Sequence, residues 1–108
     1  MADLNTESLV TANGDYDIET TAGHLYAFTL NYVSGTGTVT VKREVGNEAV
    51  YSNYKLPTDP TSNMALAASG TELGYTLRST GNSIRFTVSS ASSLQLWIKY
   101  FEIPAFRS

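Results

Sequence analysis

Apolar and polar residues alternate with a period of two along most of this chain, which is the pattern of half-buried β-strands. The clearest run lies between His24 and Val33, where one stripe is aromatic and aliphatic and the other is small or polar. The apolar stripe consists of Tyr26, Phe28, Leu30 and Tyr32. Shorter runs of the same kind occupy residues 16–20, 38–45, 75–79 and 84–88. The pattern therefore predicts an all-β protein.

Residues that favour turns separate these runs at intervals of about 8–12 residues, as in small sandwiches and barrels. Hairpin turns are expected at Ala12–Asp15, where Asn-Gly suits a type I′ turn, at Gly46–Asn47 and at Thr80–Asn82. Ser34–Gly37 and Ser89–Ser93 are expected to interrupt strands. We predict a single small antiparallel β-sandwich of about eight strands, jelly-roll-like, with an immunoglobulin-like sandwich as the second choice.

The chain length of 108 residues fits one domain. The β-sandwich is expected to span residues 9–103, between a flexible N-terminal arm at 1–8 and a C-terminal arm at 104–108. Residues 55–63 show no alternation and contain two prolines, so a central strand is not expected there. Residues 64–68 fit either a helical turn or a short strand.

The closing strand, expected from Ser93 to Ile103, is apolar on both faces. One face carries Leu94, Leu96, Ile98 and Tyr100, and the other carries Trp97, Phe101 and Ile103. A small antiparallel sandwich needs only one face of a strand for its core. The second stripe, together with Phe106 in the C-terminal arm, is therefore expected to form a protein–protein interface. The alternative is a β-bulge near Ile98 that turns Phe101 and Ile103 inward.

Charge and hydropathy argue against several classes of partner. The net charge is −3, and the scattered Lys and Arg residues lack the concentrated positive footprint of nucleic-acid-binding proteins. Neither a secretory signal nor the ~20 consecutive apolar residues of a membrane helix can be recognised. We expect a protein that is made in the cytoplasm and has no nucleic-acid or membrane partner.

The chain offers few residues for catalysis or metal binding. With one histidine and no cysteine, no zinc site is expected, and a catalytic triad would depend on His24, which is interpreted as a strand-end residue. Asp15, Asp17 and Glu19 share a strand face and fit an acid–base or calcium site, although a solvated strand face is the preferred interpretation. No catalytic residue, metal or cofactor is expected, and we do not expect an enzyme.

Four aromatic residues raise the question of carbohydrate binding. Tyr51, Tyr54, Tyr75 and Trp97 would form a sugar-stacking platform if they lay on one face. Aromatic residues in a small β-sandwich more often belong to the core or to a protein interface. Carbohydrate therefore remains the alternative ligand.

Two segments, Gly37–Val41 (GTVTV) and Ser93–Ile98 (SLQLWI), resemble strands of small phage virion proteins. Members of that class are jelly rolls or sandwiches without cysteine or signal sequence, which decorate capsids or attach to tails. The resemblance covers most of the chain in style. It implies a non-enzymatic capsid decoration or cement protein, made in the host cytoplasm, that acts in the virion as a homotrimer on the major capsid protein. The alternative that it implies is a tail-associated receptor- or carbohydrate-binding module.

Overall fold

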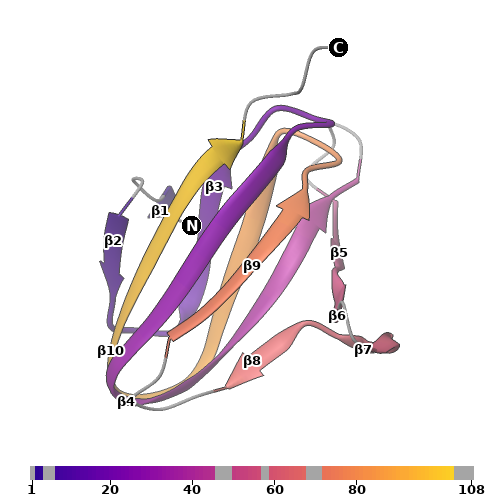
Figure 1. Ribbon diagram of the computed structural model, residues 1–108. Coiled ribbons are helices and arrows are strands. Elements are labelled where there is room, and N and C mark those ends of the chain that lie inside the picture. Colours follow the sequence, from indigo (N-terminus) through magenta and orange to yellow (C-terminus); the bar gives the residue numbers. More distant parts are fainter. Residues whose placement is uncertain (1, 4–6, 46–49, 57–58, 68–71, 104–108) are drawn as a thin grey trace.

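The fold consists of β-strands and connections, with no helix in the part of the chain that the structure describes. The computed structural model describes residues 2–3, 7–45, 50–56, 59–67 and 72–103 (Figure 1). Its strands are β1 (Ala2–Asp3), β2 (Glu7–Val10), β3 (Gly14–Glu19), β4 (Leu25–Glu44), β5 (Tyr51–Asn53), β6 (Lys55–Leu56), β7 (Asp59–Asn63), β8 (Ala65–Ala67), β9 (Glu72–Arg78) and β10 (Ser83–Ile103). The all-β prediction is confirmed.

Two long strands, β4 and β10, form the centre of the fold and pair with each other along most of their length. Each bends sharply near its middle, so that its two halves lie in different layers (Figure 1). The bends coincide with Gly35 in β4 and with Ser90 and Ser93 in β10, all three of which have positive φ angles. The predicted strand breaks at Ser34–Gly37 and Ser89–Ser93 are therefore wrong. These small residues let the backbone turn a corner without leaving the sheet.

The bends fold one eight-stranded sheet into two layers. In the front sheet, residues 96–103 of β10 lie between β2 and residues 25–32 of β4, and β9 pairs with the far side of β4. In the back sheet, residues 83–89 of β10 lie between β3 and residues 38–44 of β4, with β5 and β8 beyond. The front layer therefore has the order β2–β10–β4–β9, and the back layer has the order β3–β10–β4 with β5 and β8 beyond β4.

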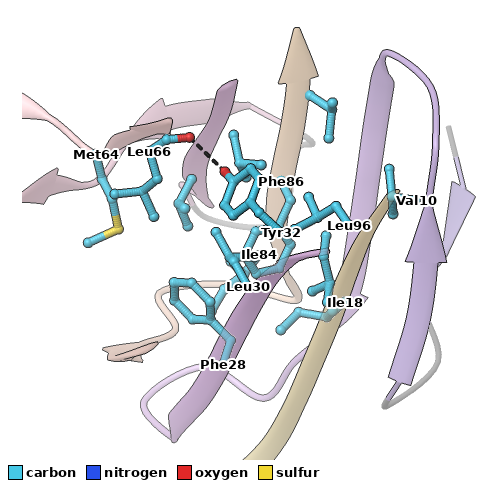
Figure 2. Packing of buried hydrophobic residues seen from close by; sticks show 14 of the residues in the cluster. Val10, Ile18, Phe28, Leu30, Tyr32, Met64, Leu66, Ile84, Phe86 and Leu96 are labelled. Atoms are coloured by element: carbon cyan, nitrogen blue, oxygen red, sulfur yellow. Dashed lines mark hydrogen bonds between the residues drawn. The ribbon is translucent and has the colours of Figure 1, made fainter. Parts of the chain in front are cut away.

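The hydrophobic core lies between the two sheets. Phe28 of the front sheet meets Phe86 of the back sheet edge to face, with ring centroids 5.1 Å apart. The Tyr32 hydroxyl crosses the core and donates a 2.8 Å hydrogen bond to the Leu66 carbonyl of β8, as Figure 2 shows. Alternation identified the inward stripes correctly. Their members Tyr26, Phe28, Leu30, Tyr32, Leu94, Leu96 and Ile98 are buried, and Tyr100 is partly buried against the core.

Two of the predicted hairpins are wrong. The turn at Ala12–Asp15 joins β2 in the front sheet to β3 in the back sheet, and the two strands do not pair with each other. The turn at Thr80–Asn82 likewise connects β9 in the front sheet to β10 in the back sheet. Local turn chemistry does not distinguish a hairpin from a connection between layers. The third predicted hairpin, at Gly46–Asn47, lies outside the described residues.

Three other segments refine the expected boundaries. Lys55–Leu56 and Asp59–Asn63 form a separate two-stranded sheet, β6–β7, in the segment where no pattern was found. Residues 65–67 form a short strand, which decides between the two structures expected there. Part of the expected N-terminal arm belongs to the sheet, because β1 pairs with β3 and β2 begins at Glu7.

Candidate interaction surface

The outward side of the front sheet carries the apolar stripe predicted for the closing strand. Leu94, Leu96 and Ile98 of β10 are buried, so the alternate residues of this strand face away from the core. Phe101 is 63% exposed, whereas Trp97 and Ile103 are half-buried. Trp97, Phe101 and Ile103 therefore lie on one outer surface, as predicted. Phe106, the fourth predicted interface residue, lies outside the described residues.

Neighbouring strands extend this stripe into a wider surface. Trp97 lies opposite Leu9 of β2, which is 47% exposed. On the other side of β10, Phe101 lies opposite Ala27 and Ile103 lies opposite Leu25. We call the combined surface the apolar outer face. It consists of Leu9, Leu25, Ala27, Trp97, Phe101 and Ile103.

A pair of charged residues interrupts the apolar outer face. Lys99 follows the same alternation and lies between Trp97 and Phe101 on β10. Its ammonium group is 3.8 Å from the Glu7 carboxylate of β2, which lies opposite it in the ladder. Both side chains are largely exposed, so this pair contributes little to stability. The sequence analysis did not include Lys99 in this stripe. The alternation of Trp97, Lys99 and Phe101 along the strand was the signal that could have placed it there.

The register excludes the alternative of a bulge near Ile98. From Leu96 to Ile103, β10 pairs with β4 without a shift, from Tyr32 back to Leu25. The irregular positions lie earlier, between Ser89 and Leu96, where the strand bends. Phe101 and Ile103 therefore keep the orientation that simple alternation gives them.

The outward side of the back sheet is polar and internally paired. Arg85 binds Asp17 through two hydrogen bonds, Nε to Oδ1 at 2.9 Å and Nη2 to Oδ2 at 3.2 Å. The Arg85 guanidinium also stacks 3.8 Å over the ring of Tyr51, and Asp15 accepts a hydrogen bond from Thr87. Hydrogen bonding to Asp17 is the main reason that the pKa of Arg85 is raised.

This network corrects the interpretation of the three carboxylates on β3. Asp17 is 5% exposed and ion-paired, so it does not belong to a solvated face. Glu19 is exposed, as expected. Among the described residues, no group of three or more His, Cys, Asp or Glu side chains is arranged to hold a metal ion.

His24 lies at the start of β4 in a small polar cluster. Its Nδ1 atom is 3.0 Å from Oε2 of Glu102, and the Tyr26 hydroxyl donates to Oε1 of the same carboxylate at 2.7 Å. The Thr21 amide donates to the Tyr26 hydroxyl. These hydrogen bonds, from Tyr26 first and from His24 second, lower the pKa of Glu102. The cluster ties the β3–β4 connection to the end of β10.

The four aromatic residues considered for sugar stacking do not share a face. Tyr51 covers Arg85 on the back sheet, whereas Trp97 lies on the front sheet. Tyr75 packs against Phe28, with ring centroids 6.0 Å apart, beside the core. Tyr54 donates its hydroxyl to the Arg78 carbonyl, and burial raises its pKa to about 12. These residues therefore do not form the sugar-stacking platform that was considered as an alternative.

Comparisons with known proteins add no relative to this description. No protein-family model, characterised protein or solved structure matches the chain. In the described residues, no helix is both long and apolar enough to cross a membrane.

Proposed function

We propose that this chain is a non-enzymatic structural protein of a phage virion, a capsid decoration or cement protein. Its apolar outer face docks on the major capsid protein, and copies of the chain associate with one another. The phage setting and the homotrimer rest on the resemblance of Gly37–Val41 and Ser93–Ile98 to virion proteins. The docking role rests on the chemistry of the two sheet faces.

The contrast between these faces is the observation that carries the proposal. On the back sheet, the outward Arg85 is ion-paired with Asp17, and Asp15 accepts a hydrogen bond from Thr87. On the front sheet, Phe101 and Leu9 are largely exposed beside the half-buried Trp97. Exposed apolar residues gathered on one face in this way mark protein contacts.

The gain on docking is hydrophobic. Covering a large apolar side chain is worth about 1.5–3 kcal/mol, and aromatic residues at the centre of an interface contribute most. Trp97 and Phe101 are the anchors in this proposal. Lys99 and Glu7 lie among them and supply a polar pair that fixes orientation. Binding only to the folded protomer also stabilises it and its partner by mass action.

The experiment compares Trp97→Ala and Phe101→Ser with the wild-type protein for binding to decoration-free heads of the phage that carries it. A matched control is Val50→Ser, which also removes an exposed apolar side chain but lies outside the apolar outer face. We expect both test variants to lose at least tenfold in affinity, and the control to bind as the wild type does. Equal binding by all four proteins would refute the proposal.

The receptor- or carbohydrate-binding alternative gives a different result in the same system. It predicts that a saccharide changes the fluorescence of Trp97 in a monomeric protein, and that binding to heads is absent. A saccharide array identifies which sugars bind the wild-type protein and whether Trp97→Ala loses that binding. Titration of the wild-type protein with such a sugar then measures the change in Trp97 fluorescence.

A further inference from the structure

β9 forms a border of the front sheet (Figure 1). Within the described part of the chain it pairs with β4 alone, over Glu72 to Arg78. The opposite border strand, β2, has four residues, whereas β9 has seven. An open strand edge of this length carries hydrogen-bonding groups that suit pairing with another strand.

The ladder shows which backbone groups face this edge. The Ser79 amide donates to the His24 carbonyl of the neighbouring chain segment, so the odd residues of this stretch bond toward β4. Because antiparallel ladders alternate, the N–H and C=O groups of the even residues point away from β4. The Arg78 carbonyl confirms this direction, since it accepts a hydrogen bond from the Tyr54 hydroxyl. Its second lone pair remains available for pairing.

The charges on β9 are complementary to those of a second copy. Glu72 and Arg78 stand at opposite ends of the strand, on the outward side of the sheet. If two β9 strands pair antiparallel about a two-fold axis at Tyr75, each Glu72 lies opposite Arg78 of the other copy. The same register places the outward-pointing backbone groups of Gly74 opposite those of Thr76. One register therefore pairs the backbone groups of Gly74 and Thr76 and sets Glu72 opposite Arg78, whose Nη1 also donates to the Gly23 carbonyl of its own protomer at 2.6 Å.

Gly74 provides an independent observation. Its φ is not positive, and a Cβ atom added there would meet nothing closer than 3.8 Å, at the Phe28 carbonyl oxygen. The fold of one protomer therefore does not require glycine at this position. A glycine inside a strand often marks the close approach of another backbone.

From these observations we infer that β9 is a self-association edge, which joins two copies of this chain into a continuous sheet across both front sheets. The contact is isologous and closes after two copies, so it gives an even number of chains. The trimer expected from the resemblance would need a different surface. The inference does not depend on the capsid role, although the two apolar outer faces would lie side by side on the same surface of the dimer.

The test is a charge-exchange series in the full chain. Glu72→Arg places two like-charge pairs across the axis, and we expect it to weaken the dimer about tenfold or more. Glu72→Arg combined with Arg78→Glu reverses both pairs and should restore the wild-type dissociation constant. Glu19→Arg, an exposed charge reversal on the back sheet, is the matched control and should have no effect. Sedimentation velocity from roughly 1 μM to 1 mM covers the range of weak contacts.

A second measurement avoids variants altogether. Hydrogen exchange at the Gly74 and Thr76 amides of the wild-type protein should slow as the protein concentration rises. A wild-type protein that remains monomeric throughout, a dimer insensitive to Glu72→Arg, or exchange independent of concentration would overturn the inference. Failure of this inference can be told apart from failure of the capsid-binding proposal, because Trp97→Ala is expected to weaken capsid binding and to leave the β9 contact intact.

Discussion

Arg85 illustrates how a single residue determines the character of a whole sheet face. Its guanidinium is held by the Asp17 carboxylate and covered by the Tyr51 ring, so a cation and an anion on the outer surface are satisfied internally. A bidentate pair of this kind has fixed geometry and low exposure. The front sheet has no comparable network among its described outward residues, where Lys99 and Glu7 form one long, exposed pair.

Loss of the buried carboxylate charge should destabilise the protein. We expect Asp17→Asn to lower the free energy of unfolding by about 2–4 kcal/mol, because Arg85 would be left without its charged partner. Glu19→Gln on the same strand is the matched control and should change it by less than about 0.5 kcal/mol. Urea denaturation at neutral pH measures both, and equal effects of the two substitutions would contradict this account.

Tyr32 predicts the response of the fold to alkaline pH. Burial raises the pKa of its hydroxyl from 10 to about 12. A pKa raised by folding contributes stability that is complete below pH 10 and is lost as the pH rises through 12. Urea denaturation between pH 8 and 12 should show this decline. The decline of the free energy of unfolding with pH should be shallower in Tyr32→Phe. This variant should also lose about 1–2 kcal/mol of stability at neutral pH, because the Leu66 carbonyl is left without its donor. Parallel curves for the two proteins would show that Tyr32 does not titrate as described.

At the scale of the strands, the two bends decide the architecture. Gly35 has a φ of 75°, and a Cβ atom added to it would collide with the Ser93 carbonyl oxygen at the corner of β10. The corners of β4 and β10 are therefore packed directly against each other. This close approach lets both strands change layer at the same level and keeps their pairing continuous on either side.

Gly35→Ala and Gly23→Ala separate backbone strain from steric collision. Both glycines have positive φ, but an added Cβ at Gly23 meets nothing within 4 Å. Gly23→Ala should therefore cost about 1–2 kcal/mol, from backbone strain alone. Gly35→Ala should cost clearly more, of order 3 kcal/mol or above, because the corner must open. Thermal unfolding of the two variants measures the difference, and equal losses would show that the corners are not in tight contact.

The strands also show how far the sequence could predict the fold. Alternation identified the inward stripes of β4 and β10, because one side of each strand is buried in the core. It could not show that Ser89–Ser93 continues a strand, since small polar residues favour turns and bends alike. The hairpin predicted at Ala12–Asp15 is wrong because Asn-Gly favours a turn whether or not the two strands that it joins pair with each other. The Asn13 side chain accepts a hydrogen bond from the Ala91 amide, a contact 78 residues away in sequence.

The candidate surface was predictable to a similar extent. Trp97, Phe101 and Ile103 follow from the alternation within one strand. Leu9 and Leu25 join them only because β2 and β4 flank β10, and that strand order depends on contacts far apart in sequence. A single sequence carries no local signal for such pairing.

At the scale of the whole molecule, the two sheets give the protein two different outer surfaces. The molecule measures 44 × 28 × 27 Å, with a polar surface around the Arg85–Asp17 pair on the back sheet and the apolar outer face on the front sheet. An elongated body with one apolar side suits attachment to a larger surface. Pairing through β9 would double that side without covering it.

The single tryptophan of the chain lies on the apolar outer face and reports directly on whether that face is covered. The most direct test is the fluorescence emission of Trp97 in the free protein and in the protein bound to decoration-free heads. Docking through this face predicts a shift of the emission to shorter wavelength and protection from an aqueous quencher. Unchanged emission and quenching in a bound protein would show that the contact is made elsewhere.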